Sequence, residues 1–289
     1  GNCITTFKGH ENYLASAVFS PDGRYLLTGS GDDTAKLWSI PNGACLKTLS
    51  GHTSSVTQSA FSPDGRYVVT GSLDSNGAIW SMPGGECIKM LKGHTSYIMS
   101  TAISRDGEYV LTGSDDGTAK VWSVPEGECL ESVNLGYVVN EIAFSPDGRL
   151  LAIGCNDRTI YLFDSMTCDL LRACRGHTGP ITSLSFSRDS RRIASGSSDS
   201  TVRIWDANSA QQRLLLRLPY SQVNTLAFSP DGRWLAAAGL NDSVTLWECD
   251  YNSTSDAAQS AGKKTLPGTA IPTTLPATTL ELAIAAARS

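Results

Sequence analysis

Four sets of residues in this chain combine the side chains that many hydrolytic enzymes use to cleave esters and amides. In each set a histidine is followed by a serine, an aspartate and a tryptophan at the same spacings. The sets are His10, Ser30, Asp32 and Trp38; His52, Ser72, Asp74 and Trp80; His94, Ser114, Asp116 and Trp122; and His177, Ser197, Asp199 and Trp205. A serine, a histidine and an aspartate could act as a catalytic triad, in which the histidine takes the proton of an attacking serine hydroxyl.

A structural role explains these residues better than catalysis does. A buried tryptophan has one N–H donor that needs an acceptor, and a serine hydroxyl can accept it. The histidine can then link the hydroxyl to the aspartate, so that a chain of hydrogen bonds joins several strands. An enzyme needs one nucleophile beside an oxyanion hole rather than four copies, and the chain has no Gly-x-Ser-x-Gly sequence. We therefore predict that the chain is not an enzyme and has no catalytic residue.

The four sets recur because the elements around them recur. A tryptophan or its replacement stands at Trp38, Trp80, Trp122, Phe163, Trp205 and Trp247, always 41 or 42 residues apart. Within the unit at 85–122, strand-like runs at 87–91, 98–104, 109–114 and 118–122 are separated by turn residues such as Asp-Gly. Short alternating runs bounded by Asp-Gly turns are typical of an antiparallel meander. Six copies therefore predict six small sheets.

This period resembles the WD-repeat family, whose repeats begin near Gly-His and end near Trp-Asp. The resemblance covers residues 1 to about 250, and it departs from the family pattern at Ser39, Ser81 and Ser123, which follow their tryptophans. It implies an all-β fold, a six-bladed β-propeller of four-stranded antiparallel blades. It also implies the hydrogen-bond chain described above at the matching positions.

The two ends of the repeat region predict how the ring closes. Residues 1–7 match the outer strands expected at 43–49 and 85–91, whereas no comparable strand follows Trp247. An open propeller would leave a strand edge unpaired, so we expect residues 1–7 to complete the sheet that ends at Trp247. The alternative is that residues 1–7 belong to a blade truncated upstream, as in a truncated seven-bladed propeller.

Two repeats have lost several members of the set together. In the fourth, Phe163 replaces the tryptophan, Cys155 replaces the serine and the histidine is absent, although Asp157 remains. In the sixth, Gly239 and Asn241 stand at the serine and aspartate positions. A half-satisfied buried network is costly, so joint loss is what a structural role predicts.

Charge and composition argue against several classes of partner. The net charge is −5 and no basic stripe stands out, so we expect no nucleic-acid partner. No apolar run is long enough to span a membrane, and we expect the protein to bind no membrane. The chain has neither a Cys-x-x-Cys nor a His-x-x-x-His sequence, so we predict no metal and no cofactor.

The cysteines repeat with the blades. Cys3, Cys45, Cys87 and Cys129 are 42 residues apart, so each should occupy the same place in a different repeat. Sheets that pack face to face lie about 10 Å apart, too far for a disulfide. We expect these cysteines to be buried thiols in a reducing, cytoplasmic compartment.

The most plausible function is binding of a protein partner. The resemblance implies that the face carrying the Gly-His loops and the turns before the tryptophan strands holds peptide segments. The residues predicted to bind there are Tyr13, Leu73, Tyr97, Asp115, Asn156 and Leu240. We expect a monomeric propeller that serves as a non-catalytic protein–protein interaction scaffold, followed by a flexible Ser/Thr/Ala/Pro-rich tail at 251–289. The alternative is a C-terminal sensor or regulatory module of a larger signalling enzyme, a kinase or an NTPase, whose catalytic part lies upstream.

Overall fold

The computed structural model describes residues 3–218, 222–239 and 243–249, so the predicted tail lies outside the described residues. The described residues contain β-strands and no helix, and their 23 strands form six antiparallel sheets. No helix in these residues could span a membrane.

Each sheet is made of consecutive strands in chain order. The first three sheets contain β1 (Leu14–Phe19), β2 (Tyr25–Ser30), β3 (Thr34–Ser39) and β4 (Cys45–Ser50); β5 (Val56–Phe61), β6 (Tyr67–Ser72), β7 (Gly77–Ser81) and β8 (Cys87–Leu91); and β9 (Ile98–Ile103), β10 (Tyr109–Ser114), β11 (Thr118–Ser123) and β12 (Cys129–Asn134). The last three contain β13 (Val139–Phe144), β14 (Leu150–Cys155), β15 (Thr159–Asp164) and β16 (Leu170–Arg175); β17 (Ile181–Phe186), β18 (Arg192–Ser197), β19 (Thr201–Asp206) and β20 (Gln212–Arg217); and β21 (Val223–Phe228), β22 (Trp234–Gly239) and β23 (Val244–Glu248).

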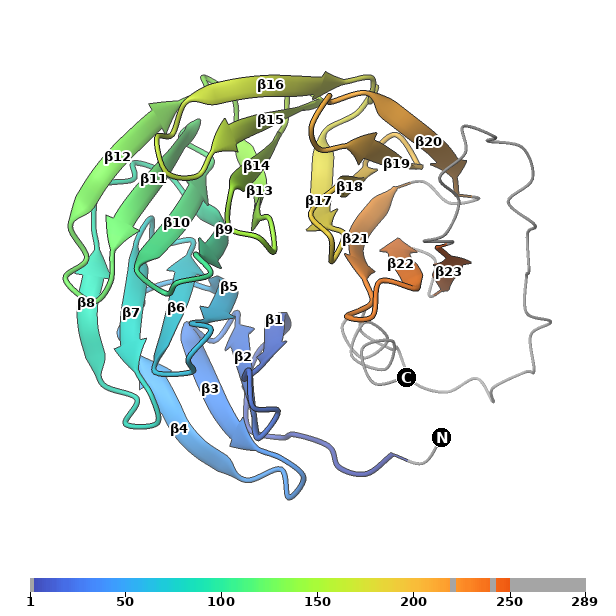
Figure 1. Ribbon diagram of the computed structural model, residues 1–289. Coiled ribbons are helices and arrows are strands. Elements are labelled where there is room, and N and C mark those ends of the chain that lie inside the picture. The colour runs from blue at the N-terminus through green and yellow to red at the C-terminus, as the bar shows by residue number, and fades with distance from the viewer. Residues whose placement is uncertain (1–2, 219–221, 240–242, 250–289) are drawn as a thin grey trace.

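The six sheets are the six predicted blades of a propeller. Figure 1 shows them following one another along an arc, with β1, β5, β9, β13, β17 and β21 toward the centre and β4, β8, β12, β16 and β20 at the rim. Consecutive innermost strands, from β1 to β21, pack against each other. The all-β fold and the number of blades predicted from the repeat are confirmed.

Neighbouring blades are joined by apolar packing between their sheets. One cluster combines Leu37 and Leu49 of the first blade with Val56 and Trp80 of the second. The close approach requires a glycine in the second strand of each of the first five blades: a Cβ atom on Gly113 would lie 2.4 Å from a methyl carbon of Val139 in the next blade. A side chain at this position would therefore force the blades apart.

Hydrogen bonds between innermost strands add to this packing. The Thr57 hydroxyl donates to the carbonyl of Ile98 in the next blade, at 2.7 Å. The Asn140 side-chain amide donates to the carbonyl of Ile181 in the same way, at 2.8 Å. Polar side chains on the innermost strands thus satisfy carbonyls of the following blade, which fixes the position of one blade relative to the next.

The beginning of the chain corrects the prediction of how the ring closes. Residues 3–7 form no strand, and the sixth blade has three strands among the described residues. The segment packs on the first blade instead, where the Phe7 ring meets Trp38 edge-on with centroids 5.7 Å apart. Leu49, 42 residues after Phe7, packs with Trp80 of the second blade in the same way. Burial against Trp38 therefore gives the segment the apolar contact of an outer strand, although it pairs with no sheet.

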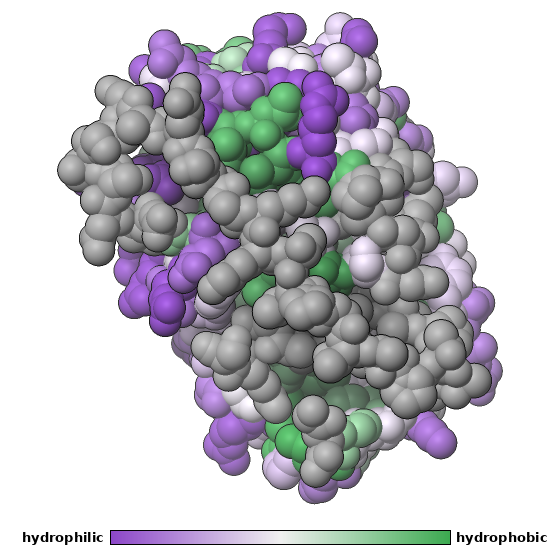
Figure 2. Space-filling view, turned by 90° about the vertical axis from the view of Figure 1, so that its right-hand side faces the viewer, coloured by the Kyte–Doolittle hydropathy of each residue, from purple (hydrophilic) through white to green (hydrophobic). Residues whose placement is uncertain are grey.

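Apolar side chains also remain exposed on the side that carries the fifth and sixth blades. Figure 2 faces this side of the molecule and shows apolar surface there. Leu214 on β20 of the fifth blade and Leu246 on β23 of the sixth are large apolar side chains that remain exposed.

Candidate functional site

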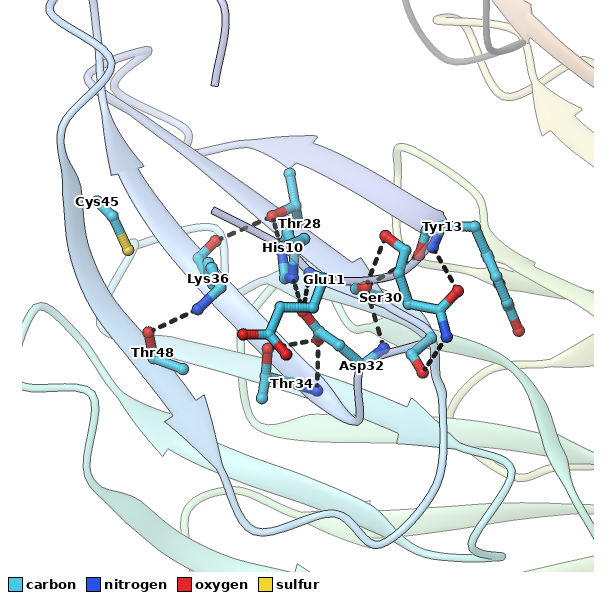
Figure 3. Close-up of polar contacts among 12 residues, drawn as sticks. His10, Glu11, Tyr13, Thr28, Ser30, Asp32, Thr34, Lys36, Cys45 and Thr48 are labelled. Carbon is cyan, nitrogen blue, oxygen red and sulfur yellow. Dashed lines mark hydrogen bonds and ion pairs between the residues drawn. The ribbon is translucent and has the colours of Figure 1, made fainter. Parts of the chain in front are cut away.

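The predicted sets of polar residues form hydrogen-bond networks inside four blades. In the third blade, His94 Nδ1 lies 2.9 Å from Asp116 Oδ2, and His94 Nε2 lies 2.7 Å from Thr112 Oγ1. The Trp122 indole N–H donates to the same hydroxyl, at 2.8 Å. Figure 3 shows the first blade, where His10 lies between Thr28 and Asp32. We call each set a tryptophan network; the others comprise His10, Thr28, Asp32 and Trp38; His52, Thr70, Asp74 and Trp80; and His177, Ser195, Asp199 and Trp205.

The hydroxyl in these networks is not the predicted serine but the residue two positions before it. Trp122 lies opposite Val110 in the hairpin of β10 and β11, so Thr112 is its diagonal neighbour and Ser114 lies too far along the strand. Ser114 instead donates to the Ser96 carbonyl at 3.0 Å and accepts the Asp116 N–H at 3.1 Å. The four predicted serines, Ser30, Ser72, Ser114 and Ser197, all bind loop backbone in this way rather than tryptophan.

The aspartate holds several segments of the blade at once. Asp116 accepts the backbone N–H groups of Thr95 and Thr118, both at 2.9 Å, besides binding His94. Burial raises the pKa of Asp116, but the hydrogen bonds from Thr118, Thr95 and His94 outweigh burial and lower its pKa to about 2. The carboxylate is therefore ionised at neutral pH.

The direction of each hydrogen bond follows from the donors available. Burial lowers the pKa of His94 and of His177, so both imidazoles are neutral at pH 7. Because the Trp122 N–H donates to the Thr112 oxygen, the hydroxyl proton is free to point at His94 Nε2. The Nδ1–H group then donates to Asp116. The networks of the third and fifth blades therefore each carry one negative charge, and their hydroxyls are both donor and acceptor.

The fourth and sixth blades lack the network, as predicted. In the fourth, Ile153 occupies the hydroxyl position and Phe163 the tryptophan position, and both are buried. The Tyr161 hydroxyl donates to Asp157 at 2.8 Å, a contact that sequence reasoning missed because tyrosine has no place in the repeat pattern. In the sixth, Ala237 stands opposite Thr245 where other blades carry the hydroxyl, and Asn241 lies outside the described residues.

One end of the propeller is formed by the loops that precede the innermost strands and by the turns between second and third strands. The two are hydrogen-bonded in each of the first five blades, as where the Asp115 N–H donates to the Tyr97 carbonyl at 2.9 Å. We call this end the loop face; it comprises residues 8–13, 31–33, 51–55, 73–76, 92–97, 115–117, 134–138, 156–158, 176–180 and 198–200.

The residues predicted to bind a partner differ in accessibility on the loop face. Tyr13 and Tyr97 are 58% and 51% exposed, and Asp115 and Asn156 are also exposed. Leu73 is only half-buried, and Leu240 lies outside the described residues. Exposure makes the first four available for binding.

A third exposed tyrosine was missed. Tyr137 is 49% exposed in the loop of the fourth blade. This loop has no histidine, and the repeat spacing places Val138, rather than Tyr137, at the position equivalent to Tyr13 and Tyr97. The tyrosine itself, in a loop that otherwise reads Leu-Gly-Val, was the available signal.

The cysteine prediction is wrong with respect to burial. Cys3, Cys45, Cys87 and Cys129 are all exposed. The last three begin the outer strands β4, β8 and β12, which have no further strand beyond them to cover their side chains.

Comparisons with known families agree with this architecture. Residues 91–248, more than half of the chain, match the model of the second β-propeller domain of WDR36/Utp21. Residues 1–39 and 43–81 match the model of the WD domain, G-beta repeat. The chain belongs to the WD-repeat propeller family. Propellers of this family generally mediate protein–protein interactions and are generally non-catalytic.

Individual relatives of this WD-repeat propeller match over about one repeat. A nuclear distribution protein, nudF 2 of Aspergillus clavatus, is 45% identical over 40 residues, which are 14% of this chain and 9% of that protein. The transcriptional repressor tup12 of Schizosaccharomyces pombe is 44% identical over 39 residues, 14% of this chain and 6% of that protein. The matched segment thus spans less than a tenth of these relatives' length.

Proposed function

We propose that this WD-repeat propeller is a non-catalytic scaffold that holds a protein partner on its loop face. The observation that carries the proposal is the exposure of Tyr13 and Tyr97, which leave about half of their surface in contact with solvent. Tyrosine is enriched at the centres of protein interfaces because it combines a large apolar surface with a polar tip. Both rings stand at the same position of their blades, on a rigid frame.

The geometry of the networks supports the absence of catalysis. The four hydroxyls that contact histidine, those of Thr28, Thr70, Thr112 and Ser195, also accept a tryptophan N–H. Their residues are buried, so a substrate could not reach them without opening the blade. A nucleophile must be accessible to its substrate, and these hydroxyls are not.

Comparative affinity purification tests the proposal. The double variant Tyr13→Ala/Tyr97→Ala should lose the proteins that the unchanged chain captures from a cell extract. The matched control is Leu46→Ala/Leu130→Ala, which removes two exposed side chains from the rim strands β4 and β12. Both variants should melt at the temperature of the unchanged protein. If the tyrosine variant captures the same proteins as the unchanged chain, the loop face is not the binding surface. The same conclusion follows if the rim variant loses those proteins to the same extent as the tyrosine variant.

We also propose a cytoplasmic location and a monomeric state. The exposed thiols of Cys3, Cys45, Cys87 and Cys129 favour a reducing compartment, because accessible thiols oxidise elsewhere. Imaging of a fluorescent fusion tests the location, and light scattering tests the monomer; a secreted fusion or a dimer would contradict them.

A further inference from the structure

Negative charge gathers on the loop face. Its acidic side chains are Glu11, Asp32, Asp33, Asp74, Asp115, Asp116, Asp157 and Asp199, and its basic ones are Lys8, Lys92 and Arg158. The turns between first and second strands, at the opposite end, hold an arginine for each carboxylate: Arg24, Arg66, Arg105, Arg149, Arg188, Arg191 and Arg233 against Asp22, Asp64, Asp106, Glu108, Asp147, Asp189 and Asp231. The turns between third and fourth strands, at that same end, add Glu86, Glu126, Glu128 and Asp169. Carboxylates are therefore in excess at both ends, and the exposed tyrosines Tyr13, Tyr97 and Tyr137 distinguish the loop face.

The tryptophan networks hold part of this charge in place. Asp32, Asp74, Asp116 and Asp199 each pair with a histidine, and no arginine or lysine forms an ion pair with them in the described chain. In the third and fifth blades the imidazole is neutral, so it donates a hydrogen bond but does not cancel the charge of the carboxylate. Asp116 and Asp199 thus place two fixed negative charges just beneath the loops, where little water screens them.

One turn of the loop face combines exposed negative charge with aromatic rings. Asp115 is exposed, and the Ser96 hydroxyl donates to one of its carboxylate oxygens at 2.9 Å. The backbone of Asp115 is bonded to Tyr97, and a Cβ atom on Gly117 would lie 3.2 Å from the Tyr137 nitrogen. The backbones of two residues with exposed side chains, Tyr97 of the same blade and Tyr137 of the next, therefore border the turn of residues 115–117.

An arginine side chain suits this combination. Its planar guanidinium can form two parallel hydrogen bonds to a carboxylate and can stack on an aromatic ring. Guanidinium also sheds water more readily than the ammonium group of lysine, so it loses less on contact with tyrosine.

We propose that the loop face binds a basic peptide segment of the partner, with an arginine seated at Asp115 beside Tyr97 and Tyr137. This inference rests on the proposed function, because it names the chemistry of the partner that the scaffold holds. The negative charges beneath the loops attract the segment, and the two tyrosines select arginine over lysine.

Fluorescence anisotropy tests the inference with a fluorescein-labelled peptide of alternating arginine and glycine. The protein should bind it more tightly than the matching lysine peptide, and a glutamate–glycine peptide should not bind. Tyr97→Ala/Tyr137→Ala should weaken binding of the arginine peptide about tenfold, and Asp115→Asn about threefold at low salt. Glu108→Gln removes the same charge from the opposite end of the same blade and should leave the affinity unchanged.

Two results would overturn the inference. One is equal weakening by Glu108→Gln and Asp115→Asn, which would mean general attraction to an acidic protein. The other is unchanged affinity in the tyrosine variant. If the arginine peptide fails while captured proteins are still lost with Tyr13→Ala/Tyr97→Ala, the scaffold function stands and the partner chemistry is wrong. If instead the arginine peptide binds as expected but Tyr13→Ala/Tyr97→Ala still captures the same proteins, the scaffold function is wrong, and the inference that rests on it fails with it.

Discussion

The substitution Thr112→Val tests the role of the hydroxyl in the tryptophan network. Valine keeps the shape of threonine but removes the oxygen that accepts the Trp122 N–H at 2.8 Å and lies 2.7 Å from His94 Nε2. Both partners are buried, so neither can turn to water instead. Leaving one buried polar group unsatisfied costs about 1–3 kcal/mol, so two should lower the free energy of unfolding by about 2–6 kcal/mol. Domains are stable by only about 5–15 kcal/mol, so the loss is readily measured.

The structure offers a control directly across the sheet. Thr101 lies opposite Thr112 in the pairing of β9 with β10, and its buried hydroxyl has no hydrogen-bond partner. The same change, Thr101→Val, removes an unsatisfied group and should leave stability unchanged or raise it. Urea unfolding followed by tryptophan fluorescence compares the two variants. Equal stabilities of Thr112→Val and Thr101→Val would refute the network as we describe it.

A second readout separates Thr112 from Ser114. Hydrogen exchange of the Trp122 indole N–H, followed by NMR, should become fast in Thr112→Val because its acceptor is gone. In Ser114→Ala the indole should stay protected, since Ser114 binds only the Ser96 carbonyl and the Asp116 N–H. Loss of indole protection in Ser114→Ala would instead support the role predicted from sequence.

Two further predictions concern titratable groups. Burial raises the pKa of Glu141, on the innermost strand β13, to about 8, so ionising it costs stability in the folded state. That cost is absent near pH 4 and grows as the pH rises from the pKa of the unfolded chain, about 4.5, toward 8. The substitution Glu141→Gln should therefore stabilise the protein progressively over this range. A gain in stability that is independent of pH in urea unfolding would contradict the prediction. Maleimide should label Cys3, Cys45 and Cys129 rapidly in the folded protein because they are exposed, and Cys87 more slowly because burial raises the pKa of its thiol. Burial raises the pKa of Cys155 and of Cys174 to about 12, so these two should react only after unfolding, and rapid native labelling of either would show that its blade opens.

The strands were predictable because their ends are set by local turn chemistry. The runs expected at 87–91 and 109–114 coincide with β8 and β10, and the run at 118–122 is β11 without its last residue. Asp-Gly and related turns close each hairpin within a few residues, so the sequence alone determines where strands begin and end. The repeat then gives the number of blades.

The site was harder to predict because it depends on register and on position in the sheet. Thr112 and Ser114 are two residues apart, so alternation places both side chains on the same face of the strand. Only the pairing of Val110 with Trp122 shows which of them the indole reaches. The cysteine error has a similar origin: a period places Cys45 on an outer strand but does not say that nothing covers that strand.

The fourth blade shows which member of the network the fold needs most. It lacks the histidine, the hydroxyl and the tryptophan, yet Asp157 still accepts the N–H of Thr159, at 3.0 Å. The same bond, from an aspartate to the N–H two residues later, occurs in each of the first five blades. The aspartate is therefore first a turn residue, and the histidine and tryptophan are added to it where they can be satisfied together. Because the turn uses a carboxyl oxygen of an aspartate as its acceptor in every one of these blades, the acidic residues of the loop face follow from the way the turns are built.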